Sequence, residues 1–512
     1  MRRTAWLSVA IALQFIVGCQ SATPVAKPAP TAVASVAPPL ALAPPPVDPL
    51  SSEPQASYVP PKPFPAVQSY SLENGVQVDF IQRHALPVVD IELLVDSGIA
   101  SEGQLAGAAK LTPEWLEAGG AGRWNSQQLR ETVDALGTNL DITVNRDSSR
   151  WSLSVTSDRL APALEVLAAL VQAPHFDATE YTKLRQRELE RVSSLGRTSG
   201  AWMAQMWLQR QLFRLPIGVH PYGSFDVLST ELERLDMSQC REWFKRYVVP
   251  QNARLVVVGD VKQDFVQKEI ERTFGHWKGT EAPAFNPTEP EDSNKFEIFV
   301  VDRPSSTQSD IYLALLGPNR RDPEFPEVAI LQQIVGGGVA GRLFSDVREK
   351  RSLAYSTSAG IQELAKAPSV LYFSAGTQTP KTAETVGALL EHLDRLGKGI
   401  VTPNELEDAQ HFLIDSMPIR WEQVQSLAWQ LSQLRTLQLP LDYYDSVRDR
   451  IGKASLESVA RVAAKFYHRG RAIIVIAGDG NAIAKSLTQF GPVTRVDPSQ
   501  NFRLREQLKA GQ

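Results

Sequence analysis

The histidines and cysteines of this chain are spaced too widely for a metal site on a single helix. The seven histidines are His84, His175, His220, His276, His392, His411 and His468, and the closest two lie 19 residues apart. A helical zinc site needs two ligands about four residues apart, so that both share one face. A zinc site built from distant histidines stays open but is disfavoured. Apart from Cys19, the only cysteine is Cys240, which we expect to be a half-buried helical side chain without redox function.

A run of glycines, Gly336, Gly337 and Gly338, is a second candidate for binding chemistry. Glycine-rich loops that bind phosphate continue into a Lys followed by Ser or Thr, and no such pair follows here. We therefore interpret the three glycines as a loop that could approach the backbone of a substrate.

Composition narrows the class of protein. The chain has 512 residues, of which 43% are hydrophobic and 21% are charged, an ordinary globular balance that predicts about three domains. Its 53 basic and 57 acidic residues give a net charge of -4, so nothing in the overall charge indicates nucleic acid as a partner. Two cysteines exclude a disulfide scaffold.

Two parts of the chain repeat one order of elements. A helical stretch that ends at Tyr247 leads through a turn into an apolar strand ending in Gly259 and Asp260. The same order ends in Gly478 and Asp479, 219 residues later. Such a repeat predicts a duplicated domain, with chance similarity of two apolar strands as the alternative. A segment rich in Pro, Glu and Asp, 278–294, predicts a linker between domains at 66–277 and 295–512.

Hydrophobic periodicity predicts the elements of each half. We expect strands at 75–81, 88–95, 296–301 and 311–316, and helices at 127–136, 161–172, 181–195, 325–335, 382–396 and 404–417. This mixture predicts an α+β fold with two homologous domains, each a mostly antiparallel sheet with helices packed on one face.

Four segments carry a resemblance to a known family. They are 72–76, 220–223, 250–260 and, most specifically, 336–356, which runs from the three glycines through Arg348 to Tyr355. Over roughly residues 66 to 490 the chain resembles the insulinase/pitrilysin family of zinc metallopeptidases, and especially its processing-peptidase-like members. The resemblance implies two homologous domains in each chain.

The zinc motif of active family members is altered in this chain. That motif, H-x-x-E-H, places two zinc-binding His on one helix face and a Glu that activates the bound water. The matching positions here hold Lys110, Pro113 and Glu114. A Lys ammonium has only hydrogen-bond donors and no lone pair for a metal ion, and a proline has no side chain that could act as a base. Because proline is best tolerated in the first helical turn, we expect a helix to start near Thr112.

The resemblance also places a third zinc ligand on a later helix, where Glu188 and Glu190 stand. Without a pair of His, we expect these two side chains to be solvated or ion-paired carboxylates. We therefore expect no metal and no cofactor in this chain, and we expect zinc in a partner chain.

A second family element is intact. It consists of an Arg, six intervening residues and a Tyr, and Arg348 and Tyr355 match it. In the family these two residues reach toward a zinc site in the other half or subunit. A Tyr hydroxyl can donate to an oxyanion, and an Arg can hold substrate carbonyls. The alternative is that Arg348 forms a surface ion pair and Tyr355 packs against the sheet.

These features favour a chain that is inactive alone. Some family members work as pairs of one zinc-bearing and one zinc-lacking chain that together take up unfolded peptides. The resemblance implies that this chain is the non-catalytic subunit, supplying Arg348 and Tyr355 to a homologous zinc-bearing partner. The alternatives are a catalytically silent scaffold or peptide-binding envelope protein, and an autonomous metallopeptidase with an unusual site.

The first residues predict export and lipidation. Basic Arg2 and Arg3 precede an apolar run, and the segment 1–18 ends directly before Cys19 in a sequence that resembles a bacterial lipobox. A plain secretory signal is the alternative. The proline-rich segment 19–65 predicts a semi-rigid tether. We expect a protein that is anchored to a membrane through lipidated Cys19, in the cell envelope and on the periplasmic side of the outer membrane.

Overall fold

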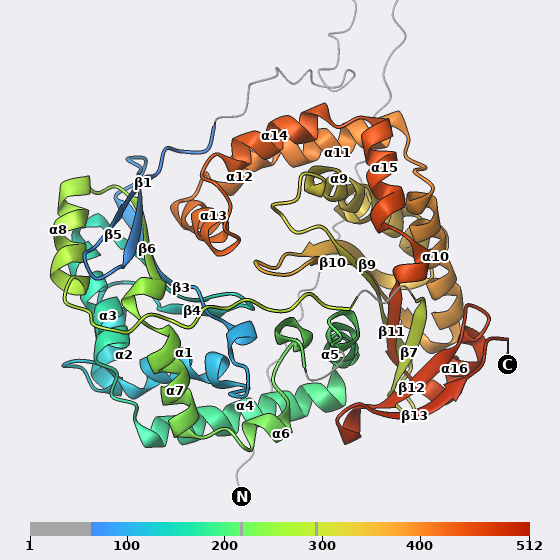
Figure 1. Cartoon of the computed structure of the whole chain (residues 1–512), viewed down its shortest axis with the longest axis horizontal. Helices are drawn as coiled ribbons and strands as arrows, with labels where there is room; N and C mark the ends of the chain where they lie inside the picture. Colours follow the sequence, from blue (N-terminus) through green and yellow to red (C-terminus); the bar gives the residue numbers. More distant parts are fainter. Residues whose placement is uncertain (1–62, 216–218, 292–294, 512) are drawn as a thin grey trace, which may run out of the picture. The chain divides into compact units, whose positions relative to one another are not determined.

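The computed structural model describes residues 63–215, 219–291 and 295–511, and the predicted signal segment and Cys19 lie outside them. Two mixed sheets form the framework of the described part (Figure 1). The strands of the first sheet are β1 (Gln68–Ser71), β2 (Gln77–Gln82), β3 (Val88–Val95), β4 (Asp141–Val144), β5 (Ser149–Thr156) and β6 (Ala253–Gly259). Their spatial order is β1-β2-β6-β3-β5-β4, in which β2 and β6 are parallel and the other neighbours antiparallel.

The second sheet repeats this arrangement. Its strands are β7 (Glu297–Asp302), β8 (Gln308–Gly317), β9 (Ala354–Gln362), β10 (Ser369–Gln378), β11 (Ile473–Gly478), β12 (Val493–Asp497) and β13 (Arg503–Leu508). Five of them follow the order β7-β11-β8-β10-β9, which matches β2-β6-β3-β5-β4, and β7 and β11 are again parallel. Gly259 and Gly478 end equivalent strands, β6 and β11. The predicted α+β fold with a duplicated, mostly antiparallel sheet is confirmed.

Each half also contains its own set of helices. The helices of the first half are α1 (Ala108–Gly119), α2 (Ser126–Ala135), α3 (Leu160–Gln172), α4 (Ala178–Thr198), α5 (Gly200–Leu212), α6 (Ser229–Leu232), α7 (Met237–Tyr247) and α8 (Gln263–Phe274). Those of the second half are α9 (Phe325–Gly336), α10 (Thr382–Gly397), α11 (Pro403–Asp415), α12 (Met417–Arg420), α13 (Val424–Thr436), α14 (Tyr443–Lys453), α15 (Leu456–Phe466) and α16 (Gly480–Leu487).

Each half contributes one helix that packs on the sheet of the other half. Helix α5 from the first half packs on β8 and β11 of the second sheet, and α13 from the second half packs on β3 and β6 of the first (Figure 1). The other face of each sheet is covered by helices of its own half, among them α3 and α10. Strands covered on both faces are mostly apolar, as the buried run 255–258 of β6 shows. The predicted layer of helices on one face is therefore present, and the helix from the other half adds a second layer.

Two further segments tie the halves together. Residues 278–291 contain neither helix nor strand, and the carbonyl of Phe285 accepts a hydrogen bond of 2.7 Å from Lys366 Nζ. Phe64, at the end of the predicted tether, is buried, with ring centroids 5.6 Å from Trp421 and 5.0 Å from Tyr444. No described helix is both long and apolar enough to cross a membrane.

Candidate functional site

Helix α1 carries the altered zinc motif, and a buried carboxylate determines where the helix begins. Glu102 accepts hydrogen bonds of 2.8 Å from the backbone N–H groups of both Gly107 and Ala109. Burial raises the pKa of Glu102 to about 8 despite these donors. The predicted helix start at Thr112 is wrong, because this cap lets the helix begin at Ala108 and leaves Pro113 in its interior. An interior proline costs about 3 kcal/mol in an ordinary helix.

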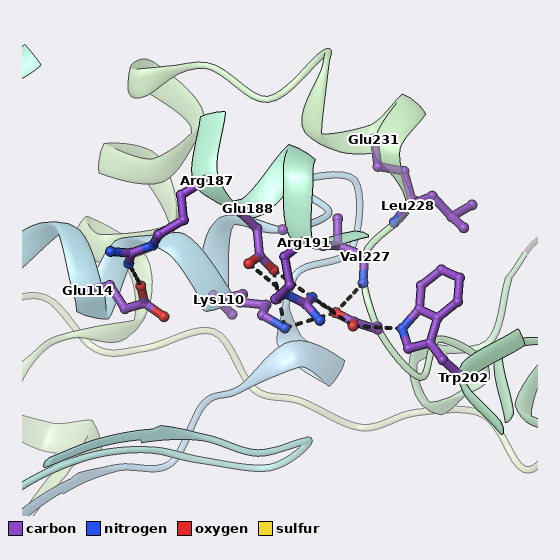
Figure 2. A network of polar contacts seen from close by, with 12 residues as sticks. Lys110, Glu114, Arg187, Glu188, Arg191, Trp202, Val227, Leu228 and Glu231 are labelled. Atoms are coloured by element: carbon purple, nitrogen blue, oxygen red, sulfur yellow. Dashed lines mark hydrogen bonds and ion pairs between the residues drawn. The ribbon is translucent and has the colours of Figure 1, made fainter. Parts of the chain in front are cut away.

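Lys110 is held by two carboxylates (Figure 2). Its Nζ lies 2.9 Å from Asp226 Oδ1 and 3.2 Å from Glu188 Oε1, which projects from α4. Arg191, one turn after Glu188, donates two hydrogen bonds of 2.7 Å to that carboxylate and a third of 2.7 Å to Asp226 Oδ2. We call Lys110, Glu188, Arg191 and Asp226 the ion-pair cluster. Two cations and two anions neutralise one another within it.

The ion-pair cluster is stabilised electrostatically. Burial would raise the pKa of Asp226, but Lys110, Trp202 and Arg191 outweigh burial and hold the pKa below its ordinary value. Trp202 contributes an indole N–H at 2.9 Å from Asp226 Oδ2. The Asp226 side chain is only 8% exposed, so its charge depends on these partners.

The remaining motif positions have other roles. Pro113 is buried in α1, and Glu114 forms an exposed ion pair of 2.6 Å with Arg187 of α4. Glu190 accepts a hydrogen bond from Gln186 on the solvent side of the same helix. The prediction of solvated or ion-paired carboxylates at Glu188 and Glu190 is therefore confirmed.

The residues at the motif positions do not fit a zinc ion. Lys110 offers no lone pair to a metal while it is an ammonium, and it occupies the space beside Glu188 and Asp226. Arg191 is already ion-paired with both of these carboxylates. Among the described residues, no group of three or more His, Cys, Asp or Glu side chains is placed to hold a metal ion.

The glycine loop follows α9 and packs closely on the second sheet. A side chain at Gly336 would place its Cβ 2.6 Å from the backbone N of Ala359 in β9, so only glycine fits there. Gly338 has a φ of 66° and is exposed, as is Val339 beside it. The loop therefore presents an open tip on a tightly packed base.

Arg348 lies in a π-helical segment, Leu343–Lys350, that follows this loop. Such segments are rare and often occur at functional sites. The guanidinium of Arg348 is exposed and stacks 4.7 Å from the ring centroid of Phe344. Among the described residues it has no ion pair, whereas neighbouring Arg351 pairs with Asp346 and Glu391. The structure therefore contradicts the alternative in which Arg348 forms a surface ion pair.

Tyr355 stands at an irregularity in β9. Its strand pairs with β10 through Ala354 and Ser356, which oppose Thr377 and Gly376, so Tyr355 is an extra, bulged residue. A Cβ at Gly376 would lie 2.5 Å from the ring, so this glycine makes room for Tyr355. The side chain is 51% exposed, and its hydroxyl donates a long hydrogen bond of 3.4 Å to Gln308. Burial, with Asp310, raises the pKa of the Tyr355 hydroxyl above its ordinary value.

The structure thus brings some predicted residues together and leaves others apart. Lys110 and Glu188 meet, but no hydrogen bond or ion pair within the described ranges links Arg348 or Tyr355 to either of them. Sequence reasoning missed Asp226 and Arg191, because neither belongs to a motif with recognisable spacing.

Cys240 is fully buried in α7, where burial raises the pKa of its thiol to about 12.

Comparison with known proteins assigns the family. The model described as insulinase (peptidase family M16) matches residues 80–214, and the model described as peptidase M16 inactive domain matches residues 234–413. Together these ranges cover more than half of the chain. The chain belongs to the insulinase family. The predicted resemblance is confirmed.

Relatives within the insulinase family include proteins with and without a peptidase name. The chain is 24% identical to a non-peptidase homologue, YmxG, of Helicobacter pylori, over 75% of this chain and 87% of that protein. It is 20% identical to the zinc protease PqqE of the same organism, over 67% of this chain and 78% of that protein. A crystal structure of a peptidase M16 inactive domain from Pseudomonas fluorescens shares 25% identity and a TM-score of 0.74, covering 81% of this chain and 98% of the other.

The altered motif and these matches agree. A Lys ammonium, a proline and a Glu paired with Arg187 stand where active insulinase-family members carry two His and a Glu. This chain is therefore a catalytically inactive member of the insulinase family.

Proposed function

We propose that this chain is the non-catalytic subunit of a two-chain zinc peptidase. In this role Arg348 and Tyr355 contribute to peptide binding and oxyanion stabilisation at the zinc site of a homologous partner. The observation that carries the proposal is a contrast within the chain. The ion-pair cluster closes the position of the family's zinc site, whereas Arg348 is exposed and free of ion pairs within the described residues, and Tyr355 is half exposed.

The chemistry of these two side chains suits this role. The Tyr355 hydroxyl has an ordinary pKa of about 10, which is raised further, so it is protonated at neutral pH and can donate a hydrogen bond to an oxygen that gains negative charge. The Arg348 guanidinium has five N–H donors in a planar fork, which can hold peptide carbonyls. Stacking on Phe344 orients this fork without using any of its donors.

The relatives support a paired arrangement. Helicobacter pylori contains one relative named as a non-peptidase homologue and another named as a zinc protease. A pair of this kind would provide the partner that the present chain needs.

The proposal is tested by isolating the tagged full-length protein gently from its native membranes and identifying what accompanies it by mass spectrometry. We expect a stoichiometric insulinase-family chain with an intact H-x-x-E-H motif, and peptidase activity in the pair but not in this chain alone. Activity of the purified chain by itself would refute the proposal. Recovery alone, or with unrelated envelope proteins only, would favour a scaffold or a peptide-binding envelope protein.

We also propose that Cys19 anchors the protein to the outer membrane, on its periplasmic side. Replacement of Cys19 by Ser is expected to move the protein from the membrane fraction to the soluble fraction of the envelope. Retention of the variant in the membrane would contradict lipid anchoring.

A further inference from the structure

A polar pocket of about 590 Å³ lies where helices α12 and α13 meet the first sheet. Its lining includes Asp90 from β3, Asp141 from β4, Ser154 from β5 and Trp429 from α13. Along β5 the buried residues alternate with less buried ones, and the latter, among them Ser154, face this pocket. The pocket is distinct from the ion-pair cluster, which lies between α1 and α4.

One carboxylate on the floor of the pocket is fully paired. Glu92 accepts a hydrogen bond of 2.8 Å from Arg150 and a short one from the hydroxyl of Ser432 on α13. Its side chain is 2% exposed. Glu92 therefore acts in the packing of α13 on the sheet and has little capacity left for a ligand.

Asp90, two residues earlier on the same strand, is less completely paired, because only Ser154 and the charge of Arg150 favour its ionised form. It is 3% exposed, and within the described residues its Oδ1 is buried without a hydrogen-bond partner. A buried carboxylate oxygen without a hydrogen-bond partner is costly, and native structures rarely keep one without a reason. Burial, with the charge of Glu92, raises the pKa of Asp90 to about 8. A cation placed in the pocket would supply the missing partner.

The other groups around the pocket favour a flat, delocalised cation. Trp429 is 42% exposed, so its ring is available to stack on a ligand. The charged groups that face the pocket are Asp90, Glu92, Asp141, Arg150 and Arg420. Arg150 is engaged by Glu92 at 2.8 Å and lies 3.9 Å from Asp141, so Arg420 is the cation left to oppose a basic ligand. Because the pKa of Asp90 is about 8, its carboxyl is mostly protonated near pH 7 in the free chain, and a bound cation would favour its ionised form.

We infer that this pocket binds the guanidinium of an arginine side chain on an extended peptide, with Asp90 as its counter-ion and Trp429 as its stacking face. A guanidinium suits the site better than an ammonium, because it stacks on aromatic rings and binds carboxylates through a planar fork. The inference deepens the proposed function, since it rests on the chain's role in binding peptides and specifies which peptides it favours. It needs no contribution from a partner or from Arg348 and Tyr355.

The test uses the full-length chain alone and two fluorescent ten-residue peptides of Gly, Ser and Ala. One carries a central arginine, and the other carries citrulline, which has nearly the same shape without the charge. We expect the arginine peptide to bind at least about tenfold more tightly, a difference of about 1.4 kcal/mol. Asp90→Asn should reduce the preference to less than about threefold, whereas Asp158→Asn, in the exposed turn that follows β5, should preserve it.

Further variants keep the result interpretable. Thermal unfolding of Asp90→Asn on the same samples establishes that the variant is folded, and Asp141→Asn at the exposed rim provides a milder removal of charge. Trp429→Leu should weaken binding of the arginine peptide more than that of the citrulline peptide. Equal affinity for both peptides, no binding of the arginine peptide at millimolar concentration, or an unchanged preference in Asp90→Asn would overturn the inference. Such results would leave the test with a zinc-bearing partner unaffected, so the two failures are distinguishable.

Discussion

Lys110 Nζ lies 3.2 Å from Glu188 Oε1, so an ion pair joins α1 to α4 at the positions where active insulinase-family members carry zinc ligands. A metal ion at this place would cross-link the same two helices. In this chain the Lys110 ammonium connects the two helices instead, and Asp226 and Arg191 complete the network of ion pairs. Loss of the zinc motif has therefore left a structural connection between the helices.

Replacing Lys110 tests that connection. We expect Lys110→Met to lower the free energy of unfolding by about 1–3 kcal/mol near pH 7, because Glu188 and Asp226 lose one of two cations. Urea denaturation measures the change. Lys183→Met is a matched control, since Lys183 forms an ion pair with Glu180 while its side chain is 65% exposed, and it should cost less than about 1 kcal/mol.

The effect of Lys110→Met should depend on pH with a defined sign. The pKa of Asp226 is lowered in the folded chain, so its contribution to stability is complete above its unfolded pKa of about 3.9 and is lost as pH falls through the folded pKa. The difference between wild type and variant should therefore shrink as the pH falls below about 4. A constant difference would show that Lys110 acts through packing of its alkyl chain.

Restoring the motif should restore metal binding. We expect the triple variant Lys110→His, Pro113→Glu and Glu114→His to bind about one zinc per chain, because two His four residues apart would face Glu188. Metal analysis after dialysis measures the stoichiometry. Adding Glu188→Gln to the triple variant is the control and should weaken retention of zinc. If the triple variant retains no more zinc than the parent chain, Arg191 keeps Glu188 from serving as a ligand.

Arg348 and Tyr355 should matter only in the assembled pair. We expect Tyr355→Phe to lower kcat of the pair by about 100-fold, as removal of an oxyanion donor does, and Arg348→Ala to lower kcat/KM by about tenfold or more. Thermal stability should change little because both side chains are largely exposed. Lys350→Ala removes a neighbouring exposed cation and serves as the control. Full activity in both variants would mean that the two residues are relics and would favour a scaffold role.

Asp90 should make the chain less stable as the pH rises. The pKa of its carboxyl is raised from 3.8 to about 8 in the folded chain, so the folded state retains a proton that the unfolded state has lost over this range. Its stabilising contribution is complete below about pH 4 and is lost as pH rises through the folded pKa. Asp90→Asn should therefore be the more stable protein at pH 9, by about 1–3 kcal/mol, and should match wild type near pH 4. A difference that does not vary with pH would contradict this account.

Much of the fold could be predicted from local patterns. The strands ending at Gly259 and Gly478 and the helices at 161–172 and 382–396 follow from hydrophobic periodicity, which depends on neighbouring residues alone. The start of α1 could not be predicted in this way. Pro113 indicates a helix start by its own preference, and a carboxylate outside the helix, Glu102, overrides that preference.

The sequence by itself determined what the chain cannot do in the manner of its active relatives. No fold can give the Lys110 ammonium a lone pair or make Pro113 a base, because these properties belong to the residues. Tertiary structure alone decided what Lys110 does instead, since Asp226 lies 116 positions later, in the segment before α6, and meets Lys110 only in the folded chain. It also decided that Glu92 is paired while Asp90 Oδ1 is not, because burial and partners depend on how α13 covers the sheet.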